Sequence, residues 1–256
     1  MWNILISEFE RMFKRKKTGI VLIVYFITVL LQGLFIYMVG GISFYDPDHS
    51  VQLNSINTAP FFLRELGLLI NFVLIPMFVI DSFNGEYHSG ALRLVLTRPI
   101  DRMKLFIAKW IVQASLFFMV TIITWLIATV YGKLWMSSAT ETAFYQTKTM
   151  NQWEGLFYTL TFYGIAYLIF LCVIGLCSLL SVILPNPIIT YIATIGCLIG
   201  AIYISDQFIY FISISDSIFS ALGNTTQLSL FLHLFLLFIF TFIMNISIWR
   251  RRQWVG

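Results

Sequence analysis

Charged residues are scarce in this chain. Asp, Glu, Lys and Arg make up 11% of the 256 residues and hydrophobic residues make up 59%, and the mean hydropathy is +0.86. In a typical soluble domain about a quarter of the residues are charged. The composition therefore excludes an ordinary soluble globular protein and predicts that lipid is the solvent for most of the chain.

Cysteine is also rare. The three cysteines, Cys172, Cys177 and Cys197, all lie inside apolar runs. A thiol in such surroundings behaves as a small hydrophobe, and the spacing matches neither a disulfide framework nor a zinc site. The sequence predicts no metal site.

Motifs of nucleotide and hydrolytic chemistry are missing. There is no G-x-x-x-x-G-K-[ST] loop, so any ATP chemistry must reside in another polypeptide. The patterns H-E-x-x-H and G-x-S-x-G are missing too. An intramembrane aspartyl protease needs two carboxylates that meet within the bilayer, whereas Asp81 and Asp206 are predicted at opposite faces. We therefore expect no enzyme activity and no bound cofactor in this chain.

Six apolar stretches are long enough to cross a bilayer as helices, which requires about 20 residues each. They are residues 20–39, 66–83, 105–131, 156–184, 188–204 and 228–249. Between the fourth and fifth stretches, Pro185-Asn186-Pro187 predicts a tight turn. The sequence thus predicts one all-α polytopic membrane domain over residues 1–256.

The positive charges lie mostly on one side of these spans. Arg64, Lys133 and Lys148 fall on one side, and the other 13 of the 16 Lys and Arg residues fall on the opposite side: Arg11, Lys14, Arg15, Lys16, Lys17, Arg93, Arg98, Arg102, Lys104, Lys109, Arg250, Arg251 and Arg252. Cytoplasmic loops carry such an excess. We expect both termini to be cytoplasmic, and we interpret the net charge of +4 as a topology signal that gives no sign of nucleic-acid binding.

Residues 1–17 form the first of two elements that do not span. Trp2, Phe9 and Met12 recur at helical spacing, and Glu8 and Arg11 are expected on the opposite, polar side. This pattern predicts an amphipathic elbow helix at the membrane surface, with its basic residues toward anionic headgroups.

The second such element is residues 205–227, where Asp206 and Asp216 stand among aromatic and aliphatic residues. The segment is too apolar for a free loop and too interrupted to span. We predict a re-entrant or interfacial helical pair whose backbone is covered by protein. Residues 41–62 and 133–154 are predicted to be polar loops.

Residues 81–109 form the longest polar interval on the predicted cytoplasmic side. Ser89 is a plausible N-cap for a short helix, which Pro99 ends, and Asp101 is placed to cap the next span. The run 90–96 is apolar and would need a partner surface. Composition alone leaves open docking of a partner and a plain solvated linker.

The same interval carries a motif. The pattern E-(x)3-G-x-L-R-L-(x)3-R-P resembles the segment after the second membrane helix of bacterial ABC type 2 permeases, the type V exporter fold. Chain length, span count and order of elements are also similar. The resemblance implies that residues 84–104 are a coupling loop whose helix seats in a groove of an ATP-binding subunit. It assigns that docking to Glu86, Gly90, Leu92, Arg93, Leu94 and Arg98, which precede Pro99.

The resemblance also implies a function and partners. The chain would be the permease subunit of an ATP-driven exporter in the bacterial cytoplasmic membrane, paired with a second permease copy or a related permease. Two ABC ATPase subunits would hold the ATP and Mg. Small members of this family commonly export amphipathic peptides, antibiotics or other hydrophobic compounds, and phenol-soluble modulin exporters are one candidate subgroup. The alternative is a polytopic scaffold or sensor partner without transport.

Two residues of the second span carry hypotheses of their own. Asp81 lies at a helix C-terminus, where the helix dipole disfavours a negative charge. We expect a cation beside it, from Arg93, Arg98 or Arg102, and a hydrated carboxylate is the alternative. Pro76 predicts that the helix kinks or loosens near Leu74. A kink there is either a hinge or a static bend accommodated by neighbouring helices.

Polar and small residues inside the other spans predict helix contacts. Gly196 and Gly200 form a G-x-x-x-G pattern, which lets helices approach closely within one chain or between subunits. Interhelical hydrogen bonds are expected from four polar residues: Asn71, Gln113, His233 and Asn245. Five tryptophans are expected at the membrane–water interface: Trp110, Trp135, Trp153, Trp249 and Trp254.

Overall fold

The computed structural model describes residues 1–46, 49–85, 101–184, 186–223 and 227–251. Within these ranges six helices are long and apolar enough to cross a membrane. The strands described are confined to two separate two-stranded sheets. The predicted all-α polytopic architecture is confirmed. The six helices are Lys16–Met38, Thr58–Gly85, Arg102–Trp135, Gln152–Ile183, Pro187–Ile204 and Ser229–Arg251.

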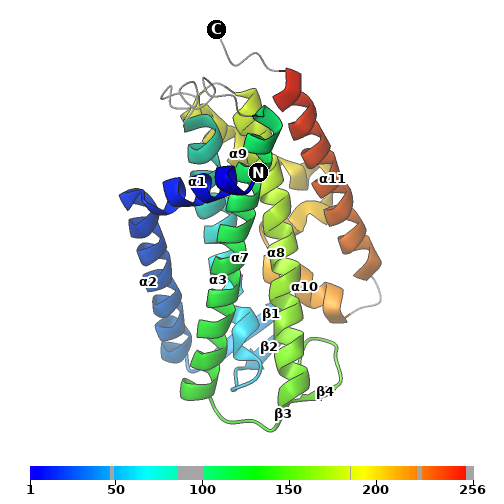
Figure 1. Ribbon diagram of the computed structural model, residues 1–256. Coiled ribbons are helices and arrows are strands. Elements are labelled where there is room, and N and C mark those ends of the chain that lie inside the picture. Colours follow the sequence, from blue (N-terminus) through cyan, green and yellow to red (C-terminus); the bar gives the residue numbers. More distant parts are fainter. Residues whose placement is uncertain (47–48, 86–100, 185, 224–226, 252–256) are drawn as a thin grey trace.

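Figure 1 shows these helices as a bundle in which α1 crosses one end and both hairpins lie toward the other. The elements in chain order are α1 (Trp2–Phe13), α2 (Lys16–Met38), β1 (Ile42–Asp46), β2 (His49–Gln52), α3 (Thr58–Leu69), η1 (Ile70–Leu74), α4 (Ile75–Ile80), η2 (Asp81–Gly85), α7 (Arg102–Trp135), β3 (Glu141–Ala143), β4 (Thr149–Asn151), α8 (Gln152–Ile183), α9 (Pro187–Ile204), η3 (Asp206–Phe211), α10 (Ile214–Gly223) and α11 (Gln227–Arg251).

Burial differs sharply between the spans. In the most apolar stretch of α8, 67% of the residues are buried inside the protein, and in the second span 61%, whereas α9 and the last span each reach 17%. The core therefore lies around α8 and the second span, which α7 joins. The α2, α9 and α11 helices present most of their surface outward.

The second span begins at Thr58, eight residues before the start predicted at residue 66. Hydropathy placed that start after Arg64 and Glu65, because charged residues are costly in lipid. In the structure the Arg64 guanidinium donates to the Phe44 carbonyl of β1, and the Thr58 hydroxyl donates to Asn54 O at 2.6 Å. These contacts hold the first turns of the helix beside the hairpin, so the helix continues through the charged pair.

Pro76 acts on the second span as its chemistry predicts. Proline has no N–H to donate and its ring crowds the carbonyl four residues earlier, and the five residues before Ile75 form the π-helical turn η1. The carbonyl four residues before Pro76 is that of Phe72, and the Tyr191 hydroxyl of α9 donates to it at 2.8 Å. A neighbouring helix thus satisfies the freed backbone group. The loosening near Leu74 is present, and a hinge role for Pro76 stays a prediction.

Two antiparallel hairpins occupy the segments predicted to be polar loops. The β1 and β2 strands pair in one, and β3 and β4 in the other. Tyr45 of β1 packs edge-on against Phe219 of α10 at 4.9 Å between ring centroids, and its hydroxyl donates to Ala143 O at 3.2 Å. Removal from water raises the pKa of Tyr45 to about 12. The hairpins are therefore packed on the bundle.

Residues 205–223 form a short 3-10 helix, η3, followed by α10. Tyr210, Phe211, Ile214, Ile218 and Phe219 are buried. Asn71 of the second span donates to Phe211 O at 2.9 Å across the gap between the elements. The non-spanning pair predicted for 205–227 thus packs one face against the bundle over its described part.

Candidate coupling junction at the end of the second span

Four successive residues of η2 each contact a different part of the bundle. They are Asp81, Ser82, Phe83 and Asn84, and with their partners we call them the junction. A π-helical turn has an extra residue per hydrogen-bonded ring, and η2 is such a turn. It directly precedes residues 86–100, which lie outside the described residues. The junction is therefore the described part of the second span that adjoins that segment.

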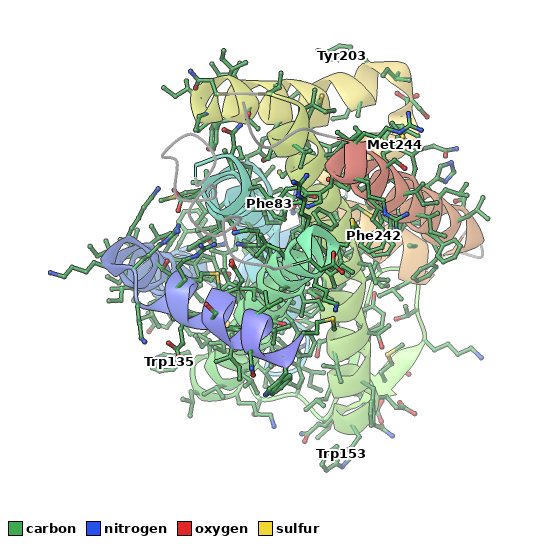
Figure 2. All side chains as sticks on the ribbon, turned by 45° about the horizontal axis from the view of Figure 1, so that its top comes forward. Phe83, Trp135, Trp153, Tyr203, Phe242 and Met244 are labelled. Carbon is green, nitrogen blue, oxygen red and sulfur yellow. The ribbon has the colours of Figure 1, made fainter. Side chains whose placement is uncertain are left out.

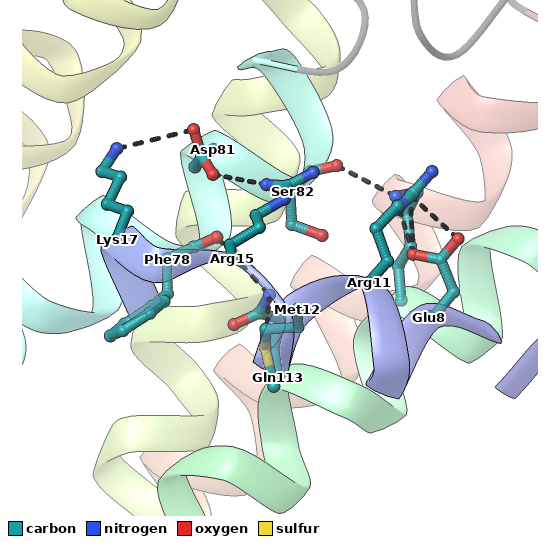
Figure 3. A network of polar contacts seen from close by, with 10 residues as sticks. Glu8, Arg11, Met12, Arg15, Lys17, Phe78, Asp81, Ser82 and Gln113 are labelled. Carbon is teal, nitrogen blue, oxygen red and sulfur yellow. Dashed lines mark hydrogen bonds and ion pairs between the residues drawn. The ribbon is translucent and has the colours of Figure 1, made fainter. Parts of the chain in front are cut away.

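Asp81 joins the second span to the elbow. Arg15 Nη1 donates to Asp81 Oδ2 at 2.6 Å, and Lys17 Nζ lies 3.6 Å from Asp81 Oδ1 (Figure 3). The Asp81 and Arg15 side chains are 37% and 34% exposed. An ion pair with this much solvent contributes about 0.2–1 kcal/mol. It can open and close at little cost.

Ser82 joins the second span to a buried ion pair between α7 and α1. Lys109 Nζ donates to Ser82 O at 3.1 Å and to Glu8 Oε2 at 3.0 Å. The Lys109 side chain is 0% exposed and the Glu8 side chain 8%. Arg11 also donates to both Glu8 oxygens, at 2.9 and 2.8 Å. Removing one partner of such a buried pair is costly, because a charge stays desolvated.

Glu8 and Lys109 correct two sequence expectations. Glu8 was expected on the polar face of the elbow, and Lys109 at the membrane surface. The elbow instead lies across α7 (Figure 1) and buries Glu8 and Met12 against it. The acid reaches inward because its cation comes from α7, 101 residues away in sequence. The pattern of apolar and polar residues within α1 gives no information about a partner on another helix.

Phe83 joins the second span to α11 through Trp249. The two ring planes meet at 88° with centroids 6.1 Å apart. The Trp249 indole N–H donates to Arg102 O, in the first turn of α7, at 2.9 Å. Trp249 is buried at 1% exposure, which corrects its predicted interfacial position. One indole therefore connects the residues just before segment 86–100 to those just after it.

Asn84 joins the second span to the turn between α8 and α9. Its Nδ2 donates to Leu184 O and to Thr190 Oγ1, both at 2.8 Å. The Asn84 side chain is buried, so these bonds replace water for a group that would otherwise be costly. The four junction residues thus contact the connection between α1 and α2, α7, α11 and the α8–α9 turn.

The start of α7 has the cap predicted from sequence. The Asp101 side chain accepts from Met103 N at 2.9 Å. Further along α7, Gln113 Nε2 donates to Phe78 O at 3.4 Å. Asp101 therefore fixes where α7 begins after segment 86–100, and Gln113 adds a second tie from α7 to the second span.

A family comparison now gives this arrangement a context. The model of the ABC-2 family of transporter proteins matches residues 5–197, a range that includes most of α1, residues 81–84 and most of α9. The chain belongs to the ABC-2 transporter family. It is accordingly a multi-pass membrane permease subunit, and members of this family work with ATPase activity held in separate partner subunits. A search of curated proteins found no match.

The docking residues predicted for this ABC-2 permease are Glu86, Gly90, Leu92, Arg93, Leu94 and Arg98. All lie outside the described residues, so their docking role stays a prediction. Of the arginines expected beside Asp81, Arg93 and Arg98 also lie outside. Arg102 is described, and no ion pair joins it to Asp81 there. The structure instead gives Asp81 the elbow cations Arg15 and Lys17.

Other polar residues of the permease contribute contacts between helices. Asn245 of α11 donates to Gly175 O of α8 at 2.9 Å, as the interhelical prediction requires, and Asn71 and Gln113 do likewise. His233 bonds within its own helix, with Nδ1 2.6 Å from Ser229 O. No group of three His, Cys, Asp or Glu that could hold a metal ion occurs in the described ranges.

In the elbow, a neighbouring lysine shifts the pKa of Glu10. Lys14 donates to Glu10 on the exposed face of α1 at 2.7 Å. This hydrogen bond and the ammonium charge lower the pKa of Glu10. The pair is open to solvent, so the main electrostatic connections of the junction are those of Glu8 and Asp81.

Proposed function

We propose that this chain is the membrane-spanning permease subunit of an ATP-driven exporter, and that the junction passes movement of segment 86–100 to the bundle. The observation that carries the proposal is that Asp81, Ser82, Phe83 and Asn84 contact four separate elements directly before that segment. Docking of an ATPase subunit on residues 86–100 would then act on the elbow, α7, α11 and the α8–α9 turn together. Both termini are cytoplasmic in this proposal.

In this proposal the buried ion pair and the partly exposed ion pair have different roles. Glu8 and Lys109 are buried and hold the elbow on α7 throughout the cycle, because separating them would leave a charge in an apolar interior. Asp81 and Arg15 are one third exposed and can separate at little cost. We therefore expect the inward and outward states to differ in the Asp81 contacts.

A second permease copy would pack on α9. This helix has Thr190, Thr194 and Leu198 as its buried residues, and a Cβ placed on Gly196 or Gly200 would meet nothing within 4 Å. Among the described residues, the G-x-x-x-G face is thus open. Gly196→Phe is expected to reduce dimer formation on size-exclusion chromatography, whereas Gly164→Phe, at an equally open glycine of α8, is the matched control.

We infer the substrate class from an apolar groove of the bundle. An apolar groove of about 550 Å3 lies between α8 and α11, lined by Leu168, Cys172, Phe231 and Phe235 among others. Such walls suit apolar or amphipathic molecules. We propose a hydrophobic or amphipathic substrate, such as an amphipathic peptide of the phenol-soluble modulin type, moved out of the cell.

The test separates docking from transmission. The permease is co-expressed with its candidate ATPase, and co-purification and peptide transport into inverted vesicles are measured. Leu92→Asp is expected to abolish co-purification. Asn84→Ala is expected to keep co-purification and lose transport. The control is Asp206→Asn, in η3 and away from the junction, which should change neither. Retained transport in the Asn84 variant would contradict the proposed role of the junction.

A further inference from the structure

A pocket of about 350 Å3 lies at the end of the molecule opposite α1. Its walls are the last turns of α7, the first turns of α8 and the loop between β2 and α3. Polar and apolar groups share the lining, among them Ser55, Ile56, Thr129, Lys133, Gln152 and Trp153. This volume is at the lower end of the range for small-molecule sites, and neither the family nor the coupling junction accounts for it.

The walls of this pocket are held in place by hydrogen bonds and a close contact. Ser55 N donates to Ser137 O at 2.9 Å, and Ala139 N donates to Ser55 Oγ at 3.2 Å. Gln152 Nε2 donates to Ala139 O at 3.2 Å. A Cβ on Gly155 would lie 2.2 Å from the Ile56 side chain, so α8 and the loop are in contact. The pocket is pre-formed and needs no rearrangement to open.

Two polar groups that line the pocket lack partners in the described part of the chain. The Lys133 ammonium forms neither an ion pair nor a hydrogen bond there. The Thr129 hydroxyl oxygen is buried and also has no hydrogen-bond partner. An unpaired buried hydroxyl is unfavourable, and a single cation beside it attracts an anion. Both observations point to a ligand that carries one negative charge and can accept hydrogen bonds.

The surroundings place the pocket where lipid meets water. Trp135 and Trp153 are 57% and 76% exposed, and Figure 2 shows both at the periphery of the bundle. Exposed Leu126, Val130 and Phe157 lie further along the same two helices, toward the middle of the bundle. Trp and Lys at such a boundary are typical of the headgroup level of a bilayer.

We propose that this pocket binds the phosphate group of an anionic phospholipid from the leaflet at this end of the molecule. Lys133 pairs with the phosphodiester, Thr129 donates to one of its oxygens, and Trp153 and Ile56 contact the glycerol and the start of the acyl chains. The single cation matches the single negative charge of a phosphodiester. The site does not depend on transport, so it can fail or stand independently of the exporter function.

The test uses the full chain purified in detergent and titrated with phosphatidylglycerol or phosphatidylcholine. A ligand that binds the folded state raises the melting temperature by mass action, which gives an apparent Kd. Lys133→Ala is expected to weaken phosphatidylglycerol binding about tenfold, because one charge-assisted contact is lost. Lys133→Arg should retain most of it. Lys148→Ala removes an equal charge from the exposed segment before β4 and should change the Kd less than about twofold.

Three results would overturn the proposal. Equal weakening by Lys133→Ala and Lys148→Ala would mean that the lipid responds to overall surface charge. Equal binding of phosphatidylcholine would remove the requirement for an anion. Saturation of the site by sn-glycerol 3-phosphate, as tightly as by the lipid, would assign it to a soluble phosphate compound. The melting temperature of each variant without lipid shows whether it is folded. Because Lys133 is exposed, its replacement should leave this melting temperature unchanged.

Discussion

At the end that carries α1, ion pairs join several of the elements, whereas at the opposite end neutral hydrogen bonds and glycine contacts make most of the connections. Glu8, Lys109, Asp81 and Arg15 make the connections at the first end. At the second, Asn54 Oδ1 accepts from Ile56 N at 2.9 Å and from Asn57 N at 3.0 Å, and Asn54 Nδ2 donates to Thr142 Oγ1 at 2.9 Å.

This difference predicts which end of the molecule moves during transport. Neutral hydrogen bonds within a packed loop fix one geometry, and a glycine contact leaves no room to shift. Ion pairs that are one third exposed can exchange partners at little cost. We therefore expect the end with the hairpins to stay rigid and the α1 end to rearrange during the transport cycle. The buried Glu8–Lys109 pair is the exception, since it is a permanent attachment within the end that moves.

The largest effect is expected from breaking that attachment. Glu8→Ala takes the carboxylate from a fully buried ammonium, which costs about 3–5 kcal/mol of unfolding free energy. Glu10→Ala, two residues away on the exposed face of α1, is the matched control and should have almost no effect. Chemical denaturation in detergent measures both. Equal stabilities would show that the elbow is not held by its buried acid.

The rigid end is tested by filling a glycine contact. Gly155→Ala places a methyl group 2.2 Å from the Ile56 side chain and should cost about 1–3 kcal/mol by overpacking. Gly164→Ala lies in the same helix with nothing within 4 Å. It should be neutral or slightly stabilising, since alanine is the better helix former. If both variants melted at the same temperature, the hairpin end would be softer than its contacts indicate.

A smaller loss of unfolding free energy is expected from Trp249→Phe. This change keeps an aromatic ring beside Phe83 and removes the hydrogen bond to Arg102 O. The expected cost is about 1 kcal/mol. Trp153→Phe alters an indole that is 76% exposed and serves as control. Thermal unfolding of the two variants distinguishes a structural indole from an interfacial one.

The smallest change in stability is expected from Asp81→Asn. Its ion pairs are one third exposed, so the loss should stay below about 1 kcal/mol and shrink further at high salt. Melting temperatures of wild type and variant at low and high salt measure this. A loss several times larger would mean that Asp81 is a fixed structural residue, which would remove the contrast with Glu8.

Sequence reasoning reached features that depend on neighbours along the chain. The Asp101 cap, the loosening before Pro76 and the six apolar spans follow from local chemistry. It missed contacts whose partners are distant in sequence, such as Glu8 with Lys109. Trp249 was expected at the surface for the same reason. The hairpins were missed because strands of three to five residues leave too short a pattern to distinguish from loop.

The most direct test of the central claim is a charge swap at the junction, with substrate exported per ATP hydrolysed as the readout. Asp81→Arg and Arg15→Asp are each reconstituted with the ATPase partner in liposomes, singly and together. We predict that each single variant still hydrolyses ATP while its export ratio falls, and that the double variant regains much of the ratio. Single variants with an unchanged ratio, or a double variant no better than either, would contradict a coupling role for this contact.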